Sequence, residues 1–279
     1  MTPVFGFCNV AIMPVRSEPS HRAEQTTQLL YGEKAIILET NVKGWARIMC
    51  VHDSYEGWCR QAQLTNITPK EFNKPTKYLS ASHNGKLLFE DNEMAIPLGS
   101  ELTGLKAGHL RAANSYGFFK GKKLTIAEVT ATEDLLKTAI LNYMHSPYLW
   151  GGRSLSGLDC SGLTQMAYKL CNFPIPRDAS QQALKGAQVE FLEMARCGDL
   201  AFFADKDERI NHVGMLLDNK TIIHCTEIVG RVVIDKIDLS GIISVSLKKR
   251  THTLRYVKRM INPETTQEKN TAAVTQLTL

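Results

Sequence analysis

The chain has 279 residues, 43% of them apolar, so it can bury a large core and is long enough for about two domains. Its 33 basic and 28 acidic residues leave a formal net charge of only +5, without a dense basic run, which argues against a nucleic-acid-binding protein. No stretch of about 18 consecutive apolar residues occurs, so we expect no membrane-spanning helix.

Cysteine usage and the amino terminus bear on the cellular compartment. The seven cysteines are an odd number and show no CxxC spacing, which argues against a disulfide framework and a zinc ribbon. The first residues lack the basic-then-apolar pattern of a signal peptide. We therefore expect a cytoplasmic protein with reduced thiols. The alternative is a periplasmic or exported protein whose targeting segment is missing from this sequence.

Residues 1–68 are predicted to form a small β-barrel. Short apolar runs at 10–15, 35–38, 44–48 and 57–60 alternate with turn residues, a spacing typical of all-β domains. The segment resembles a bacterial SH3-like barrel. The resemblance is carried by Pro14-Val15-Arg16-Ser17-Glu18-Pro19, Leu29-Leu30-Tyr31-Gly32-Glu33 and two Gly-Trp pairs. We expect Trp45 and Trp58 of those pairs to lie in the barrel core.

Three further segments follow in chain order. Residues 69–75 are predicted to be a linker, and residues 76–127 a second, degenerate SH3-like barrel that lacks the Gly-Trp pairs. From Thr132 the pattern changes to helices followed by strands, which predicts a compact α+β domain over residues 130–262. The polar, Thr/Gln-rich residues 263–279 are expected to be a flexible tail.

Cys160 is the first candidate catalytic residue. Leu163, Met166 and Leu170 recur at helical spacing after it, and Asp159 is a favourable N-cap, so Cys160 should begin an amphipathic helix. The positive end of the helix favours a thiolate, which becomes a nucleophile when a base lies within reach. A buried structural cysteine is the alternative.

Two histidines on a predicted hairpin can supply that base. If Asp218-Asn219-Lys220 forms a three-residue loop, Gly214 pairs with His224, and His212 shares a face with His224 as a diagonal neighbour. A loop of two or four residues would place the histidines on opposite faces. One imidazole could then act as base toward Cys160 while the other orients it.

Less specific interpretations of these residues remain open. Each histidine could be a satisfied structural residue, and Cys160, His212 and His224 together could ligate zinc. The zinc site is disfavoured because neither short ligand spacing nor a general-base carboxylate accompanies them. We therefore expect no metal and no cofactor. Cys225 alternates to the opposite strand face from His224 and is expected to be a core thiol.

Five motifs in order resemble the NlpC/P60 family of papain-like cysteine peptidases over residues 130–258. They are Pro147-Tyr148-Leu149-Trp150-Gly151-Gly152, Leu158-Asp159-Cys160-Ser161-Gly162, Pro176-Arg177-Asp178-Ala179-Ser180-Gln181-Gln182, Gly198-Asp199-Leu200-Ala201-Phe202-Phe203 and His212-Val213-Gly214. The resemblance implies an α+β, papain-like catalytic domain preceded by two small SH3-like β-barrels. It also implies that Cys160 is the nucleophile, His212 the base, His224 the third polar residue and Tyr148 a neighbour of the thiol.

With barrels ahead of it, the domain resembles γ-D-glutamyl-L-diamino acid endopeptidases of the dipeptidyl-peptidase VI type. These enzymes trim murein peptides with a free N-terminal L-alanine, which would make a murein-derived peptide the partner in cell-wall peptide recycling. The resemblance implies a substrate-binding set of Asp159, Ser161, Ser180, Glu56, Tyr78 and Trp150.

Several points stay open at this stage. Asp159 could act only as an N-cap, Glu56 could be a solvated loop acid, and Tyr55 competes with Tyr78 as the aromatic clamp. A cell-wall-binding protein, or an acyl-transfer protein of the same fold that acts on another acyl substrate, is the alternative function. The sequence does not distinguish lysine from meso-diaminopimelate in the substrate.

Overall fold

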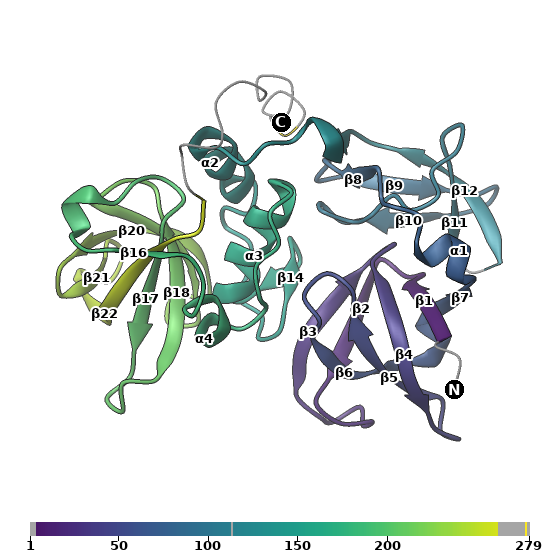
Figure 1. Ribbon diagram of the computed structural model, residues 1–279, viewed down its shortest axis with the longest axis horizontal. Coiled ribbons are helices and arrows are strands. Elements are labelled where there is room, and N and C mark those ends of the chain that lie inside the picture. Colours follow the sequence, from purple (N-terminus) through teal and green to yellow (C-terminus); the bar gives the residue numbers. More distant parts are fainter. Residues whose placement is uncertain (1–3, 113, 262–276, 278–279) are drawn as a thin grey trace. The chain divides into compact units, whose positions relative to one another are not determined.

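The computed structural model describes residues 4–112, 114–261 and 277, which fall into two compact units (Figure 1). The first unit contains Met1–Ala127 and the short excursion Trp150–Leu155, and the second contains Glu128–Leu149 and Ser156–Thr278. The excursion therefore belongs by packing to the unit that carries the barrels. The predicted tail, 263–279, lies outside the described residues except for Leu277.

The first unit begins with a seven-stranded antiparallel sheet, in the order β3-β2-β6-β5-β4-β1-β7. Apolar residues alternate along its strands, and Met13, Val15 and Ile48 are buried in its core with the thiols of Cys8 and Cys59. The strands are β1 (Val4–Cys8), β2 (Ile12–Arg16), β3 (Gln25–Leu30), β4 (Lys34–Thr40), β5 (Trp45–Cys50), β6 (Glu56–Arg60) and β7 (Leu64–Ile67). Of the two tryptophans expected in the core, Trp45 is buried and Trp58 is half-buried.

The predicted linker at 69–75 contains a short helix, α1 (Pro69–Phe72). Thr68 accepts a hydrogen bond from the backbone N–H of Glu71, and the Glu71 carboxylate accepts one from the backbone N–H of Thr68. This capping box, with Pro69 at the first helical position, stabilises a helix start. The linker prediction was therefore incomplete, because it overlooked a local helix signal.

The strands between residues 78 and 125 form a sheet in the order β10-β9-β12-β11 and a separate pair, β13-β8. Their apolar residues share a core with the first barrel, in which Phe7 and Tyr31 pack with Leu87 and Leu110. This shared core explains why residues 1–127 form one compact unit. The strands are β8 (Tyr78–Ser80), β9 (Gly85–Leu88), β10 (Glu93–Ile96), β11 (His109–Ala112), β12 (Ser115–Lys120) and β13 (Lys123–Thr125).

The second unit combines helices with a seven-stranded antiparallel sheet, in the order β16-β22-β17-β18-β19-β20-β21. Strand β22 also pairs with β21, which closes the sheet on itself. The helices are α2 (Glu133–Leu141), α3 (Cys160–Leu170) and α4 (Ala179–Gln182). The strands of this sheet are β16 (Ala187–Val189), β17 (Leu200–Ala204), β18 (Ile210–Leu216), β19 (Thr221–Thr226), β20 (Arg231–Asp238), β21 (Gly241–Ser244) and β22 (Lys249–Arg259). The short strand β15 (Gly157–Leu158) lies outside it.

Helix α3 is the central helix of the second unit and contacts both α2 and strand β18. All eleven of its residues are buried, so the expectation of an amphipathic helix was wrong. Its polar residues are satisfied internally: the Tyr168 hydroxyl donates to the Gly198 carbonyl at 2.6 Å, and the Thr164 hydroxyl donates to Gln182 Oε1 at 2.8 Å. Burial on all sides fixes the start of the helix, where Cys160 lies.

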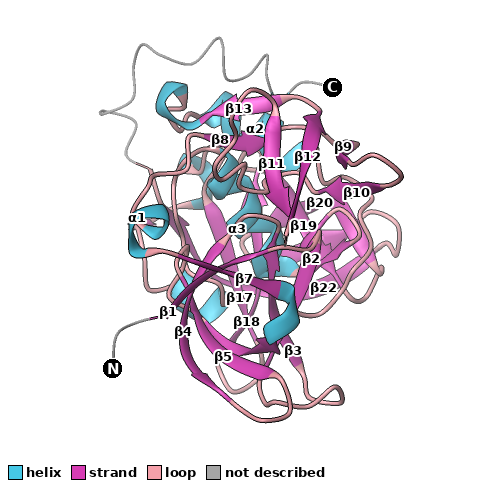
Figure 2. Ribbon diagram, turned by 90° about the vertical axis from the view of Figure 1, so that its right-hand side faces the viewer, coloured by secondary structure: helices cyan, strands magenta, loops and turns pink. Residues whose placement is uncertain are grey.

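Among the described residues, strands outnumber helices in both units. Figure 2 shows the strands in magenta and the helices in cyan. The predicted α+β class is confirmed, with the helices concentrated in the peptidase-like second unit. None of the helices in the described part of the chain has the length and apolar character needed to span a membrane.

Candidate active site

Cys160 is the first residue of α3, directly after strand β15. The Asp159 side chain accepts a hydrogen bond from the backbone N–H of Gly162 at 2.7 Å, so the predicted N-cap is confirmed. Only 9% of Cys160 is exposed. The thiol therefore lies at a rigid helix start and is almost entirely shielded from water.

The protonation state of this thiol differs from the expectation. Burial raises the pKa of Cys160 to about 12, and the Asp159 carboxylate adds to the increase. Three groups lower the pKa of Cys160, but not enough to offset this increase: the backbone N–H groups of Val213 and Ser161 and the Arg177 guanidinium. The helix start does favour the thiolate, but desolvation outweighs it, so the expected thiolate is corrected to a neutral thiol.

The imidazoles of His212 and His224 are in hydrogen-bonding contact, and the hairpin has the three-residue loop on which this prediction depended. Leu217 donates its backbone N–H to the Thr221 carbonyl, and Met215 pairs with Ile223 across β18 and β19. This register places Gly214 opposite His224, where a Cβ at 214 would lie only 2.9 Å from the His224 Cβ. The His212 Nε2 to His224 Nδ1 distance is 2.8 Å, and both side chains are buried.

The His224 imidazole is hydrogen-bonded to Asp235, an acid that the sequence analysis missed. His224 Nε2 lies 3.2 Å from Oδ2 of Asp235 on β20, and Asp235 Oδ1 accepts the backbone N–H of Val245 at 2.7 Å. Burial raises the pKa of Asp235, but hydrogen bonds from His224 and Val245 outweigh it and leave the pKa below its ordinary value. The site thus contains a buried His212–His224–Asp235 chain of hydrogen bonds.

A third histidine packs against the first. The His252 ring on β22 stacks on that of His212, with centroids 4.1 Å apart and planes 19° apart. Burial, together with the neighbouring imidazoles of His224 and His252, holds the pKa of His212 well below its ordinary value. Burial also lowers the pKa of His252, to about 4. His212 is therefore a neutral imidazole near neutral pH, the form that a general base needs.

These three histidines are also the residues that could hold a metal ion, since one ring nitrogen from each lies within 4.8 Å of the others. Neutral imidazoles are good zinc ligands. However, the rings of His212 and His252 are stacked nearly in parallel, and both nitrogens of His224 already face polar partners. The geometry fits a hydrogen-bonded relay better than a metal centre.

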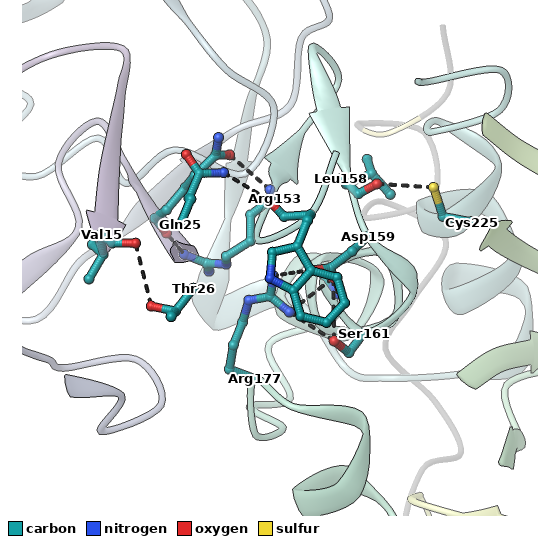
Figure 3. Close-up of polar contacts among 12 residues, drawn as sticks. Val15, Gln25, Thr26, Arg153, Leu158, Asp159, Ser161, Arg177 and Cys225 are labelled. Atoms are coloured by element: carbon teal, nitrogen blue, oxygen red, sulfur yellow. Dashed lines mark hydrogen bonds and ion pairs between the residues drawn. The ribbon is translucent and has the colours of Figure 1, made fainter. Parts of the chain in front are cut away.

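Arg177 is a further residue that the sequence analysis placed only within a motif. Its guanidinium donates to both carboxylate oxygens of Asp159, at 2.6 and 3.0 Å, and to the Ser161 hydroxyl at 2.8 Å (Figure 3). All three side chains are buried. The two residues that flank the predicted nucleophile are therefore fixed by one buried cation.

Tyr148, which the resemblance places beside the thiol, is half-buried, and its hydroxyl interacts electrostatically with Cys160. Burial raises the pKa of its hydroxyl, and Cys160 and Asp159 raise this pKa further. Its backbone N–H donates to the Gly230 carbonyl at 2.8 Å. The hydroxyl is therefore a neutral hydrogen-bonding group beside Cys160.

The other predicted substrate-binding residues are placed as follows. Ser180 is exposed in α4 of the second unit, whereas Glu56, Tyr78 and Trp150 belong to the first unit. Exposed Glu56 lies 3.7 Å from Arg47, and the Lys123 ammonium lies 4.7 Å from the centre of the half-buried Tyr78 ring. Their roles in substrate binding stay predictions.

Trp150 begins the excursion that packs on the first barrel. Its indole Nε1 donates to Glu24 at 2.6 Å, and its carbonyl accepts from Gln25 at 3.0 Å. Three residues later, Arg153 forms a buried bidentate pair with Glu33, at 2.9 and 3.0 Å. The segment is therefore held to the first barrel by hydrogen bonds of Trp150 and Arg153.

A separate cavity of about 360 Å³ lies beside α2 in the second unit. Glu133, Cys197, Asp199 and Arg259 contribute to its lining, and none of the predicted site residues does. This cavity is distinct from the site around Cys160.

Two protein-family profiles match parts of this chain. The profile described as the NlpC/P60 family matches residues 145–253, which contain Cys160 and every histidine of the relay. The profile described as the bacterial dipeptidyl-peptidase SH3 domain matches residues 15–64. A crystal structure of an NlpC/P60 family protein from Bacillus cereus shares the fold, with a TM-score of 0.78 at 20% identity over 92% of this chain and 100% of that one.

Curated relatives agree with these matches. A gamma-D-glutamyl-L-lysine dipeptidyl-peptidase of Bacillus subtilis is 28% identical over 71% of this chain and 71% of its own length. The Bacillus cereus protein of the same name is 31% identical over 71% of this chain and 66% of its own length. Dipeptidyl-peptidase 6 of Lysinibacillus sphaericus is 26% identical over 75% of this chain and 83% of its own length. The chain is therefore a peptidase of the NlpC/P60 family that carries a bacterial dipeptidyl-peptidase SH3 domain ahead of its peptidase domain.

Proposed function

We propose that this peptidase hydrolyses the γ-D-glutamyl-L-diamino acid bond of murein peptides that carry a free N-terminal L-alanine. The observation that carries the proposal is a buried Cys160 thiol that interacts with the backbone N–H of Val213, next to His212, in the same NlpC/P60 domain as the buried, hydrogen-bonded His212–His224 pair. The names of three relatives that extend over both barrel and peptidase regions support the substrate class.

In this mechanism the Cys160 sulfur attacks the γ-carbonyl carbon of D-glutamate. Because burial keeps the resting thiol protonated, the proton passes to His212 as the C–S bond forms. His212 then protonates the departing amine of the diamino acid, and a thioester to L-Ala-D-Glu remains. Water, deprotonated by the same imidazole, then attacks the thioester carbon. The C–S bond breaks, His212 returns the proton to the Cys160 sulfur, and L-Ala-D-Glu is released.

The start of α3 offers a donor for the oxyanion of each tetrahedral intermediate. The first N–H groups of an α-helix have no intrahelical acceptor, and the backbone N–H of Cys160 is one of them. A backbone donor fixed by a buried helix stabilises developing negative charge without reorganising. Tyr148, neutral and close to the thiol, can donate a second hydrogen bond.

The experiment is hydrolysis of L-Ala-γ-D-Glu-L-Lys, its meso-diaminopimelate analogue and the N-acetylated form of each, followed by mass spectrometry. We expect release of L-Ala-D-Glu from the free peptides only, and no release by Cys160→Ala. Equal cleavage of the acetylated forms would retain the peptidase but reject recognition of a free N-terminal amine. Cleavage of none would reject this substrate class.

We also propose that the enzyme works on recycled peptides in the cytoplasm. All seven cysteines are free thiols, which suits a reducing compartment. Fractionation of cells that produce the native gene product tests this: we expect the enzyme with cytoplasmic markers. Recovery in the periplasm or culture medium would reject the proposed location.

A further inference from the structure

The buried acid behind the two histidines has no role in the mechanism described so far. We propose that Asp235 is a positioning residue that fixes the direction of the proton relay, so that His212 presents an unprotonated Nδ1 to Cys160. This inference rests on the proposed function in one respect only, namely that His212 acts as the base.

The argument starts from the carboxylate and counts protons. A carboxylate can accept but cannot donate, so the His224 nitrogen that faces Asp235 Oδ2 at 3.2 Å must carry the hydrogen. A neutral imidazole has one N–H, so the other His224 nitrogen, Nδ1, is an acceptor. It faces His212 Nε2 at 2.8 Å, which must therefore be the donor. His212 Nδ1 is then left without a proton.

Burial of the three side chains enforces this assignment of protons to the histidine nitrogens. His224 is fully buried, and Asp235 and His212 are 3% and 6% exposed, so bulk water does not compete for their hydrogen-bonding groups. The His252 ring stacked on His212 restricts rotation of that imidazole. The relay therefore has two ordered proton arrangements, and the charge of Asp235 selects one of them.

The surroundings of Asp235 make an asparagine substitution especially informative. Its Oδ1 accepts the backbone N–H of Val245 at 2.7 Å, and that donor is fixed at the end of β21. An asparagine must turn its only oxygen toward this N–H, which leaves its NH₂ group facing His224. His224 Nε2 then becomes the acceptor, Nδ1 the donor, and the proton of His212 moves from Nε2 to Nδ1.

Asp235→Asn should therefore block the base while keeping the volume of the side chain. An amide behind a catalytic histidine imposes the wrong tautomer and lowers kcat about 10⁴-fold in a serine-protease triad. We expect a loss in kcat on the order of 10³- to 10⁴-fold here, with KM changed less than about threefold. Asp235→Ala removes the carboxylate without imposing a donor, so its loss should be smaller than that of Asp235→Asn.

The matched control is Asp238→Asn, the same substitution on the same strand, where the exposed carboxylate pairs with Arg250. It should leave kcat unchanged. If Asp235 only supports packing, Asp235→Ala will be the worse variant, because it leaves a cavity that asparagine fills. That ranking, or a kcat for Asp235→Asn within about fivefold of the original, would overturn the proposal.

Nitrogen-15 NMR of the histidine-labelled protein tests the tautomers without any substrate. We expect His212 to carry its proton on Nε2 in the original enzyme and on Nδ1 in Asp235→Asn. A proton on Nδ1 of His212 in the original enzyme overturns the proposal even if the variant fails to fold. Inactivity of the original enzyme on the murein tripeptides would instead reject the substrate and leave the tautomer test intact.

Discussion

Arg177 and Asp159 form a bidentate ion pair immediately before the nucleophilic position, with N–O distances of 2.6 and 3.0 Å and with 1% and 7% of the side chains exposed. The same carboxylate caps α3, so one buried pair joins the helix start to the loop before α4. Because Arg177 already pairs with Asp159, the carboxylate is part of the scaffold as well as a candidate ligand for the substrate amine.

Arg177→Met is expected to lower the free energy of unfolding by about 3–5 kcal/mol, because it leaves the buried Asp159 carboxylate without its cation. Urea denaturation at pH 7 measures the change. Arg250→Met, which removes the exposed partner of Asp238, is the matched control and should have a much smaller effect. Equal losses in the two variants would show that burial of the Arg177 pair is unimportant.

The expected pH dependence of kcat/KM follows from the lowered pKa of His212 and the raised pKa of Cys160. The pKa of His212 lies well below 6.5 and that of Cys160 is about 12, so neither group titrates between about pH 7 and 9. We expect a level profile across that range, with activity lost only well below pH 6.5, where His212 takes up a proton. An inflection centred above pH 7 that disappears in His212→Asn would contradict this assignment.

His252 should make the protein sensitive to acid. Its pKa of about 4 in the folded state lies below the ordinary value of 6.5, so the unfolded chain takes up this proton first. The stability contributed by neutral His252 is therefore complete above pH 6.5 and is lost as the pH falls toward 4, by at most about 3 kcal/mol.

His252→Phe keeps an aromatic ring against His212 but cannot titrate. Unfolding measured from pH 7 to pH 4 should show a shallower loss of stability in this variant than in the original protein. Parallel curves would mean that other groups, and not His252, cause the acid sensitivity.

The pair of Glu33 and Arg153 should be essential to the first unit, since both side chains are at least 97% buried. Glu33→Ala removes the anion and also the acceptor of the Leu30 N–H, so we expect a loss of about 3–5 kcal/mol. Glu39→Ala, at an exposed pair with Arg47, is the control and should change the unfolding midpoint little. Chemical denaturation followed by tryptophan fluorescence measures both variants.

Local signals were enough to predict the hairpin that joins the histidines. Asp218 closes a three-residue loop by accepting the N–H groups of Lys220 and Thr221, and the strand period then places His212 and His224 on one face. The start of α3 was equally local, because Asp159 is a recognisable N-cap. The capping box that begins α1 was also visible in the sequence as Thr68 and Glu71, but was overlooked.

Other features depended on tertiary packing. Asp235 faces His224 only because β20 pairs with β19 in the register that joins Ile222 to Asp235, which no short motif specifies. The sequence shows an acid between apolar residues in Ile234-Asp235-Lys236-Ile237, and its burial is apparent only from the structure. The neutral Cys160 thiol likewise results from burial of all of α3, which sequence periodicity did not reveal.

The central claim is that Cys160 forms a thioester with the L-Ala-γ-D-Glu acyl group, and acid-quench mass spectrometry tests it most directly. The enzyme is mixed with L-Ala-γ-D-Glu-L-Lys and quenched with acid within the first turnover. It is then digested, and mass spectrometry of the peptides locates the adduct. The account predicts an acyl adduct on the peptide that contains Cys160. It also predicts no adduct on Cys225, whose buried thiol donates to the Leu158 carbonyl. Product formation without any adduct on Cys160, or an adduct that persists in Cys160→Ala, would contradict the account.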